Sequence, residues 1–125
     1  MSSWLFIAAV NGFIAVAAGA FAAHGLQGRL DAHALEIFET GARYQMYHAL
    51  ALGIAAFAIR GSAATPAQTA AAFFLAGNIL FSGSLYILAL TGWRPAAFVT
   101  PIGGLAFLIG WGALAWAALK FKTGS

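Results

Sequence analysis

The feature that most constrains this chain is a series of apolar stretches that are long enough to cross a membrane as helices. The first covers residues 4–23 without a charged residue, and the others cover 43–60, 66–91 and 101–119. About 20 helical residues span roughly 30 Å, the thickness of a bilayer core. Hydrophobic residues make up 62% of the 125 residues and charged residues 7%, against about a quarter charged in soluble domains. The sequence therefore predicts an all-α integral membrane protein, a single domain built as a four-helix bundle.

The composition also excludes several classes of protein. The chain has no cysteine, so it forms no disulfide, thiolate nucleophile or cysteine metal site. Its net charge of +3 is scattered, without a basic run, which argues against binding to nucleic acid. The N-terminal letters MSSW contain no Lys or Arg, and the first apolar run is too long for a signal peptide, so we expect it to be retained as a crossing.

The end of the first crossing, GAFAAHGLQGRL, places a histidine beside a glycine. His24 is a candidate ligand for a proton, a metal or a haem, but a helix C-terminus also favours a histidine as a cap. Gly25 suits the left-handed position after such a cap, with Leu26 packing back in a Schellman arrangement. We therefore expect His24 to close the helix, and to be a site residue only if it faces His48.

The third and fourth crossings share a start signal. Thr65 and Thr100 are predicted N-caps, because each precedes a proline at the first helical position, where a missing N–H costs nothing. On this interpretation the fourth crossing begins at Pro101. Residues 92–99 then form an interfacial loop.

The only charged region lies between the first two crossings and contains all three acidic residues. Asp31 is a predicted N-cap, and Leu30 and Leu35 have the spacing of a hydrophobic staple. The spacing of apolar residues over 31–42 predicts an amphipathic helix that lies on the membrane and runs on into the second crossing. We interpret it as a cover for the end of the bundle rather than as an acid-base site.

Stripes of small residues provide the means for the crossings to associate, since lipid offers no hydrophobic drive between them. The stripes predict a tight bundle packed backbone to backbone, although a stripe could also face a second copy or a foreign subunit. The glycines we expect in packing contacts are Gly12, Gly19, Gly53, Gly83, Gly103 and Gly110.

Polar side chains within the crossings are candidates for a site. One candidate cluster lies near a single membrane face and could hold a quinone headgroup, a lipid phosphate or a haem. Its members are His24, Arg43, Tyr44, Gln45, Tyr47 and His48. The alternative is that His48 bonds a backbone carbonyl or a tyrosine and ties helices together.

A second polar set lies at mid-membrane and suits bonds between helices. Asn11 and Asn78 are expected to pair with each other, or with Ser82 and Ser84. No carboxylate or lysine lies within a crossing, which argues against a transport path. No Gly-x-Ser-x-Gly elbow is present, so we assign no catalytic residue, metal or cofactor and expect the protein not to be an enzyme.

The distribution of basic residues gives the orientation only a small bias. One side of the membrane receives Arg60, Lys120 and Lys122, and the other receives Arg29, Arg43 and Arg94. The N-terminal amine and the absence of acids on the first side favour both termini in the cytoplasm.

Four motifs in order carry a family resemblance: GAFAAHGL, YQMYHALAL, FSGSLYILAL and TPIGGLAFLIGW. Together they resemble the YgdD/YwdK family of small inner-membrane proteins, domain-of-unknown-function family 423, which is related to animal transmembrane protein 256. The family pattern usually has glycine where this chain has Ala22. The resemblance implies a four-helix inner-membrane protein without an established activity, substrate or cofactor.

Two hypotheses for the function follow. The first is a structural or binding module that packs with itself, with lipid or with a larger membrane complex. The second is a redox or transport role, in which the cluster around His48 holds a quinone or a small polar ligand at the interface.

Overall fold

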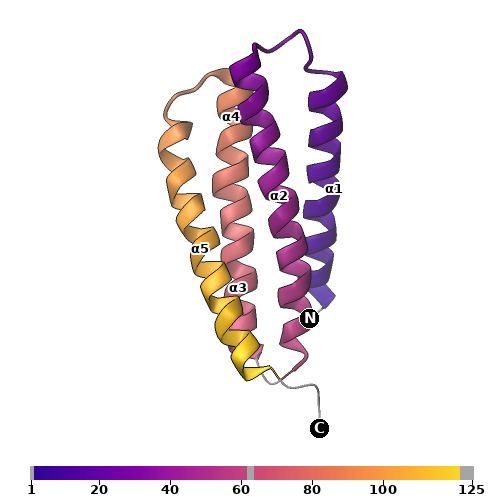
Figure 1. Ribbon diagram of the computed structural model, residues 1–125, viewed down its shortest axis with the longest axis vertical. Helices are drawn as coiled ribbons and strands as arrows, with labels where there is room; N and C mark the ends of the chain where they lie inside the picture. The colour runs from indigo at the N-terminus through magenta and orange to yellow at the C-terminus, as the bar shows by residue number, and fades with distance from the viewer. Residues whose placement is uncertain (1, 62–63, 122–125) are drawn as a thin grey trace.

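The computed structural model describes residues 2–61 and 64–121, and all its regular elements over these residues are helices (Figure 1). α3, the π-helix η1 and α4 follow one another without a break and form one rod of helix. With α1, α2 and α5 this makes four helical rods, which confirms the all-α, four-helix prediction. The elements are α1 (Ser2–His24), α2 (Ala32–Ile59), α3 (Ala64–Gly77), η1 (Asn78–Ser82), α4 (Gly83–Thr91) and α5 (Ala96–Lys120).

Three of the rods are long and apolar enough to cross a membrane: Ser3–His24, Ala64–Thr91 and Ala96–Lys120. The fourth, α2, is not in this group, although it is 28 residues long and lies alongside the others (Figure 1). Its sequence includes polar side chains such as Gln45 and His48, and both are buried against neighbouring helices. The least apolar helix therefore occupies the middle of the bundle.

The helices lie side by side, with α1 and α5 at opposite edges (Figure 1). α2 packs on α1, α3 and α4, and α5 packs on α3, η1 and α4, whereas α1 packs mainly on α2. The start of α1 and the end of α5 lie at the same end of the bundle (Figure 1). The largest core cluster, around Phe74 and Leu52, joins α1, α2 and α3.

α1 ends at His24 as predicted, but the turn that follows differs from the predicted one. The N–H groups of Gly25 and Leu26 both donate to the Phe21 carbonyl, at 2.7 and 3.0 Å. The left-handed residue is Gly28, with φ of 80°, so the prediction of a left-handed Gly25 is wrong. Leu26 still packs back, 5% exposed, against Ala22 and the start of α2. Because Gly25 continues the helical bonding, the reversal comes three residues later.

The start of α2 follows the predicted cap. Asp31 accepts a hydrogen bond from the Ala34 N–H at 2.8 Å, and Leu30 and Leu35 pack on the same apolar cluster. The helix predicted over 31–42 runs on into the second crossing as predicted, but it does not lie across the end of the bundle. These residues form the first turns of α2, which continues unbroken beside α1 and α4 (Figure 1).

The predicted starts of the third and fourth crossings are too late. α3 already includes Thr65, whose carbonyl accepts from the Thr69 hydroxyl at 3.1 Å. α5 begins at Ala96 after Pro95, so Thr100 and Pro101 lie inside the helix and the connection is only 92–95. A proline is tolerated anywhere in a first turn, because none of the first four N–H groups has a helical partner. Pro95 provides that start for α5, and the sequence rule had selected the second proline of the pair.

The predicted packing glycines fall into two groups. A Cβ at Gly103 would collide with the Phe81 backbone, and one at Gly110 with the Phe74 ring. Gly12 has ordinary contact with Ala49, whereas Gly19, Gly53 and Gly83 have no atom within 4 Å of an added Cβ. Gly103 and Gly110 both lie where α5 meets α3 and η1, and so does Gly77, against Phe107, which was not predicted; Gly41, against Tyr86, is a tight position elsewhere that was not predicted either.

Candidate functional site

A chain of side-chain amides joins three helical rods in the interior. The Asn11 amide oxygen accepts from Gln45 Nε2 at 3.2 Å and from Asn78 Nδ2 at 3.0 Å. Tyr86 OH donates to Gln45 Oε1 at 2.7 Å, and Asn11 Nδ2 donates to the Ile7 carbonyl at 2.9 Å. Because unpaired amides are costly away from water, this network fixes α1, α2 and the α3–η1–α4 rod relative to one another.

The π-helix η1 lies where this network meets α5. Asn78 begins the π-helix and places its amide toward α1 and α2, with Nδ2 also 3.4 Å from the Gln45 carbonyl. Asn78 Oδ1 and Ser82 Oγ are buried and have no partner within residues 2–61 and 64–121. Two residues after Ser82, the Ser84 hydroxyl bonds the Phe81 carbonyl and the Thr100 hydroxyl. A π-turn widens a helix and often occurs at functional sites.

His48 lies on the opposite side of α2 from α1, with both ring nitrogens in hydrogen bonds. The Trp111 indole can only donate, so its 3.0 Å contact makes His48 Nε2 the acceptor. His48 Nδ1 is then protonated and donates to the Tyr44 carbonyl at 2.8 Å. The ring stacks on Phe107 with 3.5 Å between centroids and 7° between planes. These contacts hold His48 as a neutral imidazole with neither nitrogen free for a ligand.

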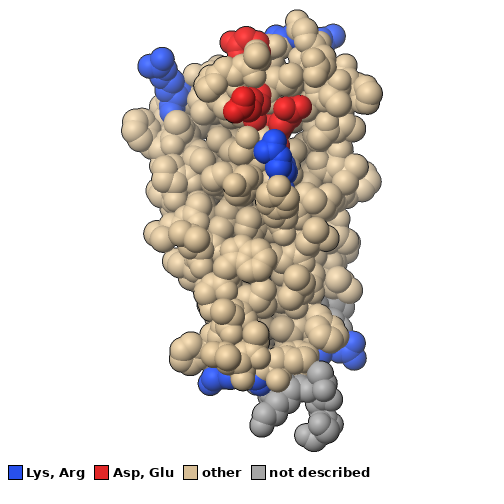
Figure 2. Space-filling view, in the orientation of Figure 1, with Lys and Arg blue, Asp and Glu red and all other residues tan. Residues whose placement is uncertain are grey.

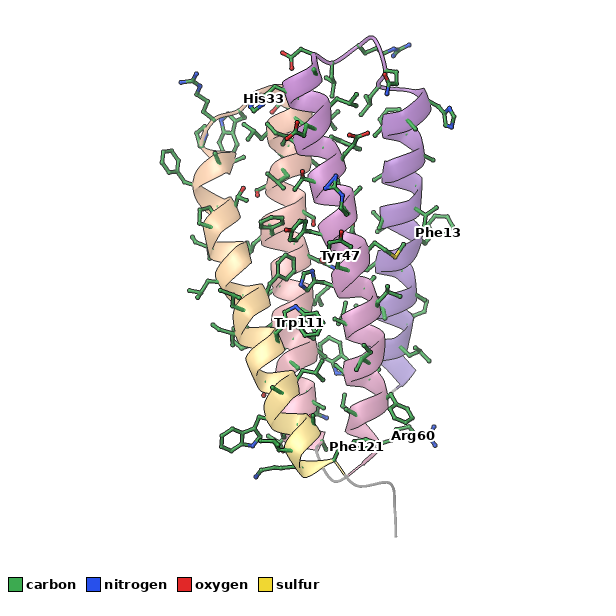
Figure 3. The ribbon with its side chains drawn as sticks, viewed as in Figure 1. Phe13, His33, Tyr47, Arg60, Trp111 and Phe121 are labelled. Carbon is green, nitrogen blue, oxygen red and sulfur yellow. The ribbon has the colours of Figure 1, made fainter. Side chains whose placement is uncertain are left out.

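An open groove runs along the outside of this histidine, between α2, η1 and α5. We call it the aromatic groove; its volume is about 500 Å³. Tyr47 of α2 and Trp111 of α5 are both among its lining residues (Figure 3). Tyr44 and Tyr47 are 37% and 49% exposed, and within the described parts of the chain their hydroxyls have no hydrogen-bond partner. The groove is lined by Tyr44, Tyr47, His48, Phe81, Gly104, Phe107, Leu108 and Trp111.

Comparison with known proteins gives this architecture a family. A family model described as "Protein of unknown function (DUF423)" matches residues 18–104, more than half of the chain. The chain belongs to the DUF423 family. No solved structure matches it.

The names of three relatives state only that they are membrane proteins. UPF0382 membrane protein SAB0533 of Staphylococcus aureus is 46% identical over 97% of this chain and 98% of its own length. UPF0382 membrane protein YwdK of Bacillus subtilis is 43% identical over 97% of this chain and 99% of its own length. UPF0382 inner membrane protein YgdD of Escherichia coli is 42% identical over 94% of this chain and 90% of its own length. The protein is thus a membrane protein of a family whose function is unestablished.

In this DUF423 protein the predicted cluster around His48 divides into separate places. Tyr44, Tyr47 and His48 line the aromatic groove, and Gln45 points the other way into the amide network. Arg43 lies toward α1, and His24 is exposed at the end of α1. The prediction that His24 and His48 lie near the same membrane face is wrong. α2 begins at Ala32, so His48 is 16 residues down the helix, roughly 24 Å from its start.

The second predicted polar set does come together in part. Asn11 and Asn78 share a hydrogen bond, while Ser82 bonds to neither of them and Ser84 bonds to Thr100 across to α5. Among the partners that the sequence did not indicate, Gln45 for Asn11 and Thr100 for Ser84 are polar. The others are aromatic: Tyr86 for Gln45, and Phe107 and Trp111 for His48. Their rings look like ordinary lipid-facing residues in an apolar sequence. Only the rotation of each helix about its own axis shows that these rings face Gln45 and His48 instead of lipid.

The polar groups of the interior and those of the aromatic groove differ in their availability to a ligand. Within the ranges that the structure describes, no group of three or more His, Asp or Glu side chains could hold a metal ion. In the described part of the chain the interior amides bond to each other, apart from Asn78 Oδ1, which like Ser82 Oγ has no partner. The aromatic groove presents flat rings together with two tyrosine hydroxyls. Such a surface suits a flat, lipid-soluble molecule that accepts hydrogen bonds.

Proposed function

We propose that the protein is a membrane binding module without catalytic chemistry, and that the aromatic groove binds a lipid-soluble ligand with a flat, oxygen-bearing ring. The observation that carries the proposal is the pair of unpartnered tyrosine hydroxyls beside a wall of stacked aromatic rings. A quinone headgroup has this chemistry: it stacks through its ring and accepts hydrogen bonds through its carbonyl oxygens.

The back wall of the groove supports this proposal because it is preorganised. His48 is held by Trp111, by the Tyr44 carbonyl and by stacking on Phe107, so a ligand would meet a fixed surface. A rigid wall lowers the entropy lost on binding. In this arrangement His48 orders the groove and the two tyrosines contact the ligand, which differs from direct ligation by histidine.

The test uses two glycines of the same helix. Gly104 lines the groove, and a leucine there would fill it; Gly112 lies eight residues on, outside the groove and with open space around it. The full chain is reconstituted in nanodiscs and titrated with a short-chain benzoquinone. We expect Gly104→Leu to weaken binding about tenfold or more, since it removes the whole contact surface, and Gly112→Leu to bind like the parent protein.

Two results would overturn the proposal. One is saturable quinone binding that Gly104→Leu does not change; the other is no quinone binding, with native mass spectrometry showing only phospholipid on the purified protein. A variant with both Tyr44→Phe and Tyr47→Phe separates the hydroxyls from the rings. We expect it to retain the fold and to lose part of the affinity.

For the orientation we propose that both termini lie in the cytoplasm. The end of the bundle that holds the start of α1 and the end of α5 carries the N-terminal amine, Arg60 and Lys120 and none of the three acidic residues of the sequence, whereas those acids lie with the other arginines toward the opposite end (Figure 3 labels Arg60). Basic residues favour the cytoplasmic side. Fusion of alkaline phosphatase to the C-terminus should give an inactive reporter; an active one would reverse the orientation.

A further inference from the structure

A face of the bundle distinct from the aromatic groove carries charges at an unusual depth. Glu39 and Arg43 on α2 line a hollow together with Ala15 and Gly19 of α1. Gly19 lies five residues and Ala15 nine residues before His24, so the charges are roughly 8 to 13 Å inside the end of α1. α1 is uncharged over the whole span Ser3–His24. The charges therefore lie beside the apolar belt that the helix presents to lipid.

These charges have no ion-pair partner in the described part of the chain, and Glu36 one turn away has none either. Figure 2 shows acidic and basic side chains gathered near one end of this face, above a wide uncharged belt. Charges next to hydrocarbon are costly unless they are paired. Such a face is typical of a surface that a second protein covers, since a partner could supply the opposite charges that the described part of this chain does not.

The shape of the face points to the same conclusion. Below the charges a second, apolar hollow of about 570 Å³ continues between α1 and α2, with Gly12 at its floor. Phe13 stands at its edge, 77% exposed, and projects from α1 (Figure 3). The surface therefore has both a protruding ring, Phe13, and a hollow lined by Gly12 that could receive such a ring from a neighbour. Small residues at such a site let neighbouring helices approach closely.

We infer that the protein forms a symmetric homodimer in the membrane through this α1–α2 face, with Arg43 of each copy paired to Glu39 of the other and Phe13 of each seated over Gly12 of the other. Copies inserted in the same orientation are related by an axis along the membrane normal, so Arg43 of one copy lies one turn, about 6 Å, below Glu39 of the other, a difference in depth that these two long side chains can span. Glu39 and Arg43 are one turn apart and carry opposite charges, which makes the face complementary to itself. The inference does not depend on ligand binding in the aromatic groove.

The first experiment reverses the charges in the full chain. Oligomeric state is measured by single-molecule photobleaching in liposomes over a range of protein densities. Glu39→Arg and Arg43→Glu should each lower the dimer population about tenfold or more, because each replaces two attractive pairs with two repulsive ones, and the double exchange should restore it. Arg94→Glu, which changes an exposed arginine on the α4–α5 connection, should leave it unchanged.

The second experiment uses the absence of cysteine from the chain. Phe13→Cys should form a disulfide-linked dimer in membranes on mild oxidation, whereas Leu105→Cys, 58% exposed on α5 at the other edge, should not. Monomers at every density, a dimer indifferent to charge reversal, or equal cross-linking at both cysteines would each overturn the inference. Cross-linking of Phe13→Cys to a foreign protein instead of itself would do so as well.

Quinone binding is measured on the same preparations. A monomeric Arg43→Glu variant that binds quinone normally supports the dimer face and leaves the groove intact. A Gly104→Leu variant that loses quinone binding but remains a dimer supports binding in the groove and leaves the dimer face intact. The two proposals can therefore fail separately.

Discussion

The two sides of the bundle use glycine in opposite ways. Where α5 meets α3 and η1, a phenylalanine of the same chain occupies the space beside each of three glycines: Gly77, Gly103 and Gly110. Where α1 meets α2, Gly19 has no neighbour within 4 Å and Gly12 only one methyl group at 3.9 Å. α1 and α5 each carry a stripe of small residues that lie three or four positions apart. The comparison shows that such a stripe marks a close approach, and does not say whether the approaching surface belongs to the same chain.

The two sides also differ in what holds them together. α5 is joined to its neighbours by interlocked rings and a glycine against backbone, whereas α1 is joined mainly to α2 and through Asn11 to the amide network. Substitutions on the α5 side should therefore act through steric fit. Those on the α1 side should act through hydrogen bonds or have little effect on the single chain.

The largest effect is expected at Gly103. Gly103→Ala places a methyl group into the backbone of Phe81, and since backbone cannot rotate away, we expect a loss of about 3 kcal/mol in the free energy of unfolding. Gly104→Ala is the matched control, because its Cβ meets only a Phe81 ring atom at 3.9 Å. Unfolding by SDS in mixed micelles measures both. Equal stability of the two variants would contradict the closed packing of this side.

The next effect is expected at Asn11. Asn11→Ala removes the oxygen that Gln45 and Asn78 share, which leaves two buried donors without that acceptor and should lower stability by about 2 kcal/mol. Asn78→Ala should also destabilise, and the double variant should lose less than the sum of the two, as expected for residues in one network. Strict additivity in this double-mutant cycle would show that the two amides do not interact.

A smaller effect is expected at His48. His48→Phe keeps a ring to stack on Phe107 but removes the acceptor for the Trp111 indole, so we expect a loss of about 1 kcal/mol. Tyr47→Phe, which changes a half-exposed ring with an unbonded hydroxyl, should stay within about 0.5 kcal/mol of the parent. A thermal melt in one detergent compares them. If the two variants melt together, the histidine does not stabilise the α2–α5 contact.

The smallest effect is expected at Gly19. Gly19→Ala adds a methyl group to open space in a helix, so the stability of the single chain should be unchanged or rise by up to about 1 kcal/mol. The same melt at high dilution in detergent measures it. A loss comparable to that of Gly103→Ala would mean that the α1 side is closed like the α5 side.

Local signals in the sequence predicted local structure well. Asp31 caps α2 as its position before an apolar repeat indicates, and the four rods follow from apolar length. The pairing of Asn11 with Asn78 also follows from a general rule, because amides inside a membrane seek one another. These features depend on neighbours in sequence or on a cost that any partner can relieve.

The rotation of each helix about its own axis could not be predicted in the same way. α1 and α5 are apolar on every side, so no polar face shows which residues turn inward. For this reason Trp111 and Phe107 could not be assigned to His48, nor Tyr86 to Gln45. The predicted start of α5 was wrong because two prolines, Pro95 and Pro101, gave equally good local signals for a helix start.

The π-helix has a consequence for how this protein tolerates insertions and deletions. A π-turn holds one residue more than an α-turn, so loss of one residue within 78–82 would leave an α-turn with α3 and α4 in nearly the same relative rotation, whereas loss of two residues would rotate α4 by about 100° against α3. Tyr86 and Ser84 would then turn away from Gln45 and Thr100, although the hydropathy of the rod would hardly change. Two chains that insert into a membrane equally well would thus differ in whether their helices fit together. In this protein the length of one short segment, as much as its composition, determines the bundle.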